Sequence, residues 1–219
     1  MKYIDINSWS RKNQYENFIK YTNPTFSVCS ALDVTKLVTY CQKNNISFFS
    51  SFMYIVANNV NKVKEMRLRL KDDKVVSFER THPSYVVLCN GDELRTCKTA
   101  FSVDFSDFYS RTQKDIILTK TNKPSAFNKD NGTDCFYISS LPWIKFSSIT
   151  NPYNYQDKEQ TSIPRITWGR FYKTDQGFEI NFDVSVHHAL VDGVHVSNLI
   201  KNIENQLNTL DFLEDNNEG

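Results

Sequence analysis

Glycine and proline are scarce in this sequence, because the 219 residues contain only six of each. No stretch rich in glycine, proline or serine divides the chain, and no internal repeat is present. Hydrophobic residues make up 40% and aromatic residues 14%, which excludes a disordered protein and is enough for one large core. We therefore predict a single domain over residues 1–213, followed by an acidic tail at residues 214–219.

Cysteine is also sparse, and no two cysteines stand in a Cys-x-x-Cys pair. An odd total of five argues against a disulfide scaffold or a structural zinc site and favours a reducing compartment. Residues 1–9 lack the apolar run of a signal peptide, and no segment approaches the ~20 apolar residues of a membrane span. We expect a soluble, cytoplasmic protein without a membrane partner.

Charge of one sign is missing as well, since 26 basic residues balance 25 acidic ones for a net charge of +1. No polybasic surface is therefore expected, which argues against nucleic acid as a partner. The Gly-x-Ser-x-Gly motif of serine hydrolases, the phosphate-binding loop and the dinucleotide fingerprint are all absent.

Strands and helices are expected to alternate along the chain. Helices are predicted over residues 34–44, with Asp33 as N-cap, and over residues 49–63, 105–117 and 194–210. Strands are predicted over residues 84–89, 165–173 and 178–186, with a hairpin at residues 68–78 and a loop at residues 119–134. This order indicates an α/β fold, or an α+β sandwich.

Three of the four histidines lie between residues 187 and 195, where a predicted strand leads into the last helix. Residues 178–186 alternate between apolar and polar side chains, which is typical of a half-buried strand. If the strand continues, His188 points inward with the apolar set and His187 with the polar set. A buried imidazole stays neutral near pH 7 and is available as a base.

These residues are also compatible with roles that involve no catalysis. His188 could be an ordinary core histidine, and Asp192 could simply cap the last helix. His187, His188, Asp192 and His195 could bind a metal, but adjacent histidines on a strand point to opposite faces and no His-Glu-x-x-His helix is present. We expect no metal site.

Residues 187–193, His-His-Ala-Leu-Val-Asp-Gly, resemble the His-His-x-x-x-Asp-Gly signature of the CoA-dependent acyltransferase superfamily. The chain length narrows the resemblance to the chloramphenicol acetyltransferase family. So do three blocks in the family's order: Asp-x-x-x-Trp-x-Arg-Lys at 5–12, residues 66–72 with His-Pro-Ser-Tyr at 82–85, and Ser-x-x-Pro-Trp-Ile-x-Phe-x-Ser at 139–148. The resemblance implies the CoA-dependent acyltransferase fold, a mixed β-sheet flanked by helices, in a homotrimer.

The resemblance also implies roles for the matching residues. His188 is the general base, Ser148 donates a hydrogen bond to the oxyanion, and Thr167 supports the transition state. Asp192 and Arg11 form an ion pair that holds the site in shape.

Further residues are implied as binding groups. Arg170 stands at a lysine position near the CoA, and Asn17, Phe18 and Cys29 are candidates for the acceptor pocket. Acetyl-CoA is implied as co-substrate, with no tightly bound cofactor. The histidine comes from one subunit of the trimer, and much of the acceptor pocket comes from its neighbour.

The implied reaction is transfer of the acetyl group from acetyl-CoA to a hydroxyl of chloramphenicol by direct attack. Some positions depart from known chloramphenicol-inactivating members: Val191 replaces a cysteine, Val194 replaces an aromatic residue, and Asn17 with Phe18 replaces an aromatic-rich pair. Two alternatives therefore remain. The acceptor could be another hydroxylated small molecule, or the protein could be a non-catalytic binding trimer of the same fold.

Overall fold

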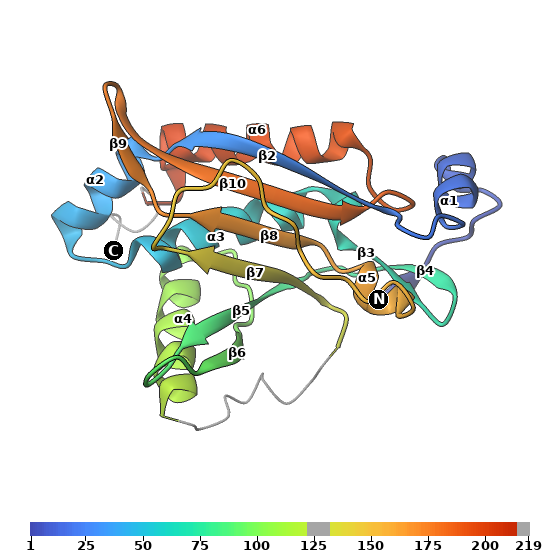
Figure 1. Cartoon of the computed structure of the whole chain (residues 1–219), viewed down its shortest axis with the longest axis horizontal. Helices are drawn as coiled ribbons and strands as arrows, with labels where there is room; N and C mark the ends of the chain where they lie inside the picture. Colours follow the sequence, from blue (N-terminus) through green and yellow to red (C-terminus); the bar gives the residue numbers. More distant parts are fainter. Residues whose placement is uncertain (122–131, 214–219) are drawn as a thin grey trace.

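The structure is a computed structural model that describes residues 1–121 and 132–213 (Figure 1). Its main feature is a mixed seven-stranded sheet in the order β2-β10-β8-β7-β5-β6, with β9 paired to β10. These strands are β2 (Thr25–Asp33), β5 (His82–Leu88), β6 (Leu94–Lys98), β7 (Cys135–Leu141), β8 (Arg165–Gly169), β9 (Tyr172–Thr174) and β10 (Gly177–His187). A smaller sheet joins β1 (Lys2–Tyr3), β4 (Lys74–Ser77) and β3 (Leu68–Lys71). The predicted tail at residues 214–219 lies outside the described residues.

Helices cover one face of the main sheet, and residues 142–157 cross the other (Figure 1). The helices are α1 (Lys12–Phe18), α2 (Thr35–Asn44), α3 (Phe48–Lys62), α4 (Phe105–Lys120), α5 (Lys158–Thr161) and α6 (Gly193–Thr209), with short 3₁₀ helices η1 (Lys64–Arg67) and η2 (Asp211–Leu213). The predicted α/β architecture with a mixed sheet flanked by helices is confirmed. Among the described residues, no helix has both the length and the apolar character needed to cross a membrane.

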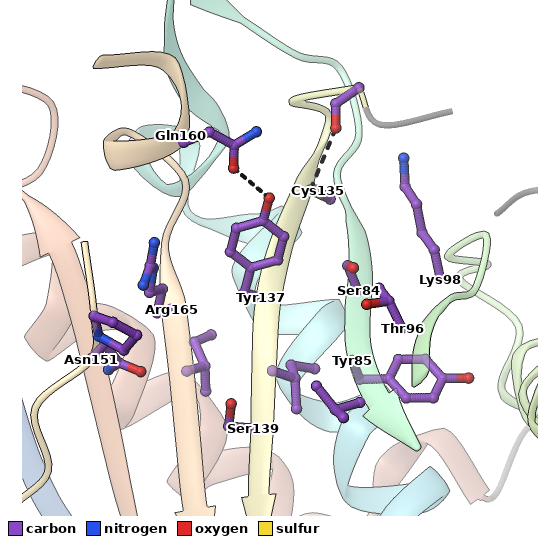
Figure 2. A pocket seen from close by; sticks show the side chains of 15 residues that line it. Ser84, Tyr85, Thr96, Lys98, Cys135, Tyr137, Ser139, Asn151, Gln160 and Arg165 are labelled. Atoms are coloured by element: carbon purple, nitrogen blue, oxygen red, sulfur yellow. Dashed lines mark hydrogen bonds between the residues drawn. The ribbon is translucent and has the colours of Figure 1, made fainter. Parts of the chain in front are cut away.

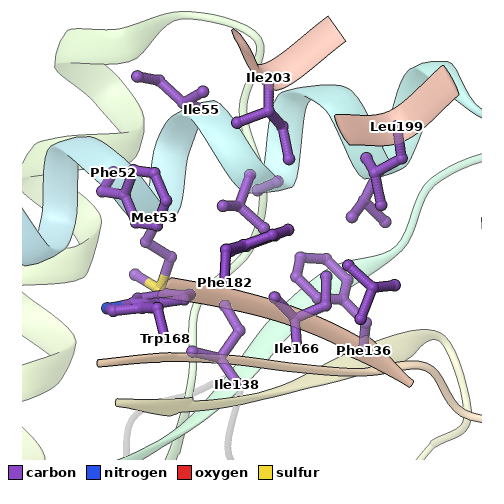
Figure 3. Close-up of a cluster of buried hydrophobic side chains, with 14 of the residues drawn as sticks. Phe52, Met53, Ile55, Phe136, Ile138, Ile166, Trp168, Phe182, Leu199 and Ile203 are labelled. Atoms are coloured by element: carbon purple, nitrogen blue, oxygen red, sulfur yellow. The ribbon is translucent and has the colours of Figure 1, made fainter. Parts of the chain in front are cut away.

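The core lies between the sheet and helices α3 and α6 (Figure 3). Phe52 of α3 packs edge-on against Trp168 of β8 and Phe182 of β10, with ring centroids 5.1 and 6.0 Å apart. Leu199 and Ile203 of α6 are fully buried over the same sheet face. The predicted apolar stripes of both helices therefore face the core, because burying them removes apolar area from water.

Capping side chains place the helix starts close to where the sequence predicts them. Asp33 Oδ1 accepts a hydrogen bond from the Thr35 amide at 2.8 Å, and α2 starts at Thr35. Asp104 Oδ1 accepts from the Asp107 amide at 2.6 Å at the start of α4. This helix runs to Lys120, so Thr119 and Lys120 are helical rather than part of the predicted loop. Much of that loop lies outside the described residues.

The predicted strand over residues 165–173 is wrong as a single element. It is divided into β8 and β9 at Arg170 and Phe171. The Arg170 amide donates to the Ile144 carbonyl at 2.8 Å instead of to a strand, and the Phe171 ring packs against Phe48 at 4.9 Å. A β-carbon on Gly169 would come within 2.8 Å of the Ile144 carbonyl oxygen, so glycine permits this close approach.

The polar side of β10 is not exposed as a half-buried strand would be. Asp183 and Ser185 are only 1% and 2% exposed, although they alternate with core residues. Residues 142–157 cover this side, and the Tyr153 hydroxyl lies 2.8 Å from Ser185 Oγ. The prediction of one solvated face is therefore wrong for the second half of the strand.

Candidate active site

His188 follows directly after β10, and its backbone amide donates to the Pro24 carbonyl at 2.7 Å. Its ring stacks on Phe18 of α1 with centroids 3.7 Å apart and planes 8° apart, and Phe26 of β2 lies at 4.7 Å. One third of the side chain, 33%, remains exposed. The imidazole is thus held between two aromatic rings and still has an accessible edge.

The position of His188 corrects the strand-parity prediction. Because β10 ends at His187, His188 does not continue the alternation and does not enter the core. The fully covered histidine is His187, at 3% exposure, whose Nδ1 accepts from the Ala189 amide at 3.2 Å. Burial lowers the pKa of His187 to about 4, with His188 adding to the effect, so His187 is a neutral structural residue near pH 7.

An ion pair fixes the turn that carries His188. Arg11 donates two hydrogen bonds to the Asp192 carboxylate, one of them 3.1 Å long from Nη2 to Oδ1. The same Nη2 lies 3.3 Å from the His188 carbonyl oxygen. The residue is only 7% exposed, and burial lowers the pKa of its guanidinium. Arg11 therefore ties the N-terminal segment to both ends of the motif.

Asp192 also faces the ring of His188. Its Oδ1 lies 3.3 Å from His188 Nδ1, although the two atoms are not aligned as a hydrogen bond and Nδ1 is buried. A carboxylate at this distance favours a proton on Nδ1, which leaves the lone pair on Nε2. The Asp192 amide donates to His195 Nδ1 at 2.9 Å, so Asp192 also starts helix α6.

The structure does not bring Ser148 and Thr167 to His188 within one chain. Thr167 of β8 pairs with Asp183, five residues before His188, or about 16 Å along the strand at ~3.3 Å per residue. Ser148 is exposed, four residues after Ile144, which is anchored beside Gly169 at the other end of β8. Among the described residues, no hydrogen bond links either hydroxyl to His188. Thr167 Oγ1 is buried and has no partner.

The remaining predicted site residues are divided between two places. Phe18 contacts His188, and Asn17 precedes it on α1 with an exposed side chain. Cys29 lies opposite Asp183, four register positions from the Thr25–His187 pair, and does not contact His188. Burial raises the pKa of its thiol. Arg170 is exposed at the end of β8, beyond Thr167.

The described part of the chain holds no group of three or more His, Cys, Asp or Glu side chains placed for a metal ion. His188 and His195 have separate neighbours: His188 faces Asp192, whereas His195 Nε2 lies 3.8 Å from Glu65 Oε1.

Comparison with known proteins matches this arrangement to one family. The sequence model of the chloramphenicol acetyltransferase family matches residues 1–204. A chloramphenicol acetyltransferase of Clostridium butyricum is 30% identical over 212 residues, and one of Proteus mirabilis is 28% identical over 203 residues. Each alignment covers 92% of both chains.

This chain belongs to the chloramphenicol acetyltransferase family.

Solved structures show the same fold. A chloramphenicol acetyltransferase superposes with a TM-score of 0.86 at 23% identity, covering 94% of this chain and 99% of the other. The catalytic core of a 2-oxoacid dehydrogenase complex from Thermoplasma acidophilum superposes with a TM-score of 0.69 at 14% identity, covering 96% and 100%. The predicted family and fold are confirmed, and the chain is an acyltransferase enzyme.

Beyond the motif, this family member carries a polar sheet face that the sequence analysis did not anticipate. Ser139, Thr167, Asp183 and Cys29 form one cross-strand row on β7, β8, β10 and β2. Asp183 Oδ1 is buried without a partner, and burial raises the pKa of this carboxyl to about 6. Only the register between strands could reveal the row, because its members lie far apart in sequence.

A pocket of about 510 Å³ opens on the same face (Figure 2). Strands β5 to β8, residues Asn151 and Pro152, and Gln160 of α5 line it. Tyr137 stands in its centre and donates to Gln160 at 2.7 Å. Phe26, Tyr137 and Arg165 were all missed as site residues, since each is of a type common in ordinary strands.

Proposed function

We propose that this chain transfers the acetyl group of acetyl-CoA to a hydroxyl of chloramphenicol, with His188 as general base. The observation that carries the proposal is the setting of His188. Its ring is fixed by Phe18, its Nδ1 faces Asp192, and its other edge is accessible. The names of the relatives supply the acceptor.

The proposed reaction needs no covalent enzyme intermediate. Nε2 of His188 takes the hydroxyl proton while the acceptor oxygen attacks the thioester carbonyl. The tetrahedral oxyanion accepts a hydrogen bond from Ser148, and Thr167 supports the transition state. When the carbon–sulfur bond breaks, His188 returns the proton to the CoA thiolate. The Arg11–Asp192 pair keeps the imidazole in place throughout.

The proposed active unit is a homotrimer with each site at a subunit boundary. Support comes from the separation of the site residues, because Ser148 and Thr167 lie away from His188 in one chain. A neighbouring copy that presents its polar sheet face to His188 would complete the site. In this arrangement the pocket in Figure 2 contributes the acceptor half.

Acetyl-CoA is proposed as a passing co-substrate rather than a resident cofactor. Arg170 is exposed at the end of the strand that carries Thr167, where a guanidinium could bind a CoA phosphate. We place the activity in the cytoplasm, where all five cysteines, which are free thiols in the structure, would stay reduced.

The test is release of CoA thiol from acetyl-CoA in the presence of chloramphenicol. His188→Ala should lower kcat by about 10²–10⁴-fold, the usual contribution of a general base, without changing the urea midpoint. Lys201→Ala, an exposed change on α6, is the control and should keep the parent rate. A parent protein that releases no thiol with any acceptor would instead be a non-catalytic binding trimer.

A second acceptor class is favoured by one observation, the polar lining of the pocket. Serine, threonine, tyrosine, glutamine and two basic residues line it, whereas chloramphenicol presents an aromatic ring. Thiol release with another hydroxylated small molecule, and none with chloramphenicol, would select this alternative.

A further inference from the structure

Five polar side chains form a continuous row across the sheet, next to the row that contains Thr167. The register pairs Lys98 with Ser84, Ser84 with Tyr137, Tyr137 with Arg165, and Arg165 with Ser185. Paired residues on neighbouring strands point to the same face, so these side chains share one surface. The first four line the pocket of Figure 2.

Arg165 is held in this row by its flat faces. Its Cζ lies 3.8 Å from the ring centroid of Tyr153 and 5.8 Å from that of Tyr137. Stacking of this kind uses the π-face of the guanidinium and leaves the N–H donors in its plane free for a planar anion. Nε of Arg165 is buried and has no hydrogen-bond partner among the described residues.

The charge of the pocket is positive and incompletely balanced. Its two charged lining residues are Lys98 and Arg165. Lys98 Nζ binds Asp134 Oδ1 at 2.6 Å, so this charge is neutralised locally. For Arg165, no carboxylate oxygen of residues 1–121 or 132–213 lies within the 4.0 Å of an ion pair. A half-buried guanidinium without a counter-ion favours an anionic ligand, because the burial of an unpaired charge is costly.

We infer that Arg165 is a specificity-determining residue that binds an anionic group of the acceptor. The inference rests on the proposed function, since it places the anion in the acceptor half of that site. The pocket also contains Ser139, whose register partner is Thr167, and Asn151, three residues after Ser148. An acceptor held by Arg165 would therefore extend toward the hydroxyls proposed to act on the transition state.

The acceptor class is a small hydroxylated molecule that carries a carboxylate or a similar planar anion. Carboxylate oxygens match the fork of the guanidinium and can accept two parallel hydrogen bonds. The Tyr137 hydroxyl and Ser84 offer further polar contacts in the same row. A cationic acceptor is disfavoured by both lysine and arginine.

The experiment compares two aryl alcohols of equal shape, 4-(hydroxymethyl)benzoate and the neutral 4-nitrobenzyl alcohol, in the thiol-release assay. The parent trimer should show kcat/KM about 10- to 100-fold higher for the carboxylate, the range of a charge-assisted hydrogen bond. Arg165→Met should bring the ratio close to one, and Arg165→Lys should keep part of it. Arg111→Met, an exposed change on α4, is the control and should keep the full ratio.

Two results would overturn the inference: a parent ratio of one or less, or an unchanged ratio in Arg165→Met. Loss of the trimer in Arg165→Met without a change in ratio would make Arg165 an interface residue, which also contradicts it. If no acceptor, chloramphenicol included, releases thiol, calorimetric binding of 4-(hydroxymethyl)benzoate decides. Binding that Arg165→Met abolishes supports the anion site while the proposed function fails, and absence of binding overturns both.

Discussion

Asp183 is 1% exposed on β10, and burial raises the pKa of its carboxyl to about 6. An unfolded aspartate titrates near 3.9, so the native state holds the proton more tightly than the unfolded state. Stability should therefore fall as the pH rises from about 4 through about 6, by roughly 3 kcal/mol in total. Urea unfolding of the parent and of Asp183→Asn at pH 4.5 and pH 8 measures this loss.

Asp183→Asn should be more stable than the parent at pH 8 and similar to it at pH 4.5, because the amide does not ionise. Asp175→Asn, in the exposed turn before β10, should follow the parent at both pH values. Equal pH dependence in the parent and in Asp183→Asn would mean that another group is responsible.

Arg11 and Asp192 should be energetically coupled, since their hydrogen bonds span 181 residues of sequence. Arg11→Met or Asp192→Asn alone leaves a partly buried group without its partner and should cost about 2 kcal/mol or more. The double variant should cost less than the sum, which a double-mutant cycle in urea measures. Strict additivity would show that the pair contributes nothing to stability.

Individual site residues were predictable where the motif names them. The Arg11–Asp192 contact follows the family pattern, whereas the exposure of His188 does not follow strand parity, because β10 stops one residue earlier. Arg165 and Asp183 gave no sequence signal. Each acquires its environment from neighbouring strands and from residues 142–157.

At the level of elements, Arg69 connects strand β3 to the start of β7. It is fully buried, and its guanidinium donates to the carbonyls of Met66, Leu68, Thr133 and Cys135. Burial lowers the pKa of this guanidinium to about 10, so it remains charged at neutral pH.

Arg69→Met should lower the free energy of unfolding by about 3 kcal/mol or more, because several buried carbonyls lose their donors together. Chemical denaturation at pH 7.5 gives the value, and Arg111→Met is again the exposed control. A loss below about 1 kcal/mol would mean that water replaces the lost donors.

Elements with strong periodicity were predictable, and those without it were not. The hairpin of β3 and β4 was predicted around Asp72 and Asp73, and both turn residues have positive φ, 49° and 56°. Strand β2 was missed because its burial pattern does not alternate. It forms through nine register pairs with β10, which no local pattern contains.

At the scale of the whole molecule, the proposed trimer predicts complementation between two inactive variants. Co-expressed His188→Ala and Ser148→Ala chains would form mixed trimers in which some sites receive an intact histidine from one copy and an intact serine from the next. An equal mixture should recover about a quarter of the parent thiol-release rate, from the random assortment of two chains around a cyclic trimer.

Each variant alone should stay at its low rate, and a double variant mixed with His188→Ala should recover nothing. Light scattering checks that all mixtures remain trimeric. Failure of the two single variants to complement would place both residues in one subunit, or would remove Ser148 from the site.

The sequence by itself determined the family, the helices with clear apolar stripes, and the motif that carries His188. These features are local or are repeated as ordered blocks, so a linear pattern contains them. Only the tertiary structure decided which histidine is exposed and which polar residues share a face. Those outcomes depend on strand register, on where β10 ends, and on the segment that covers the sheet. All three arise from contacts between residues far apart in the chain.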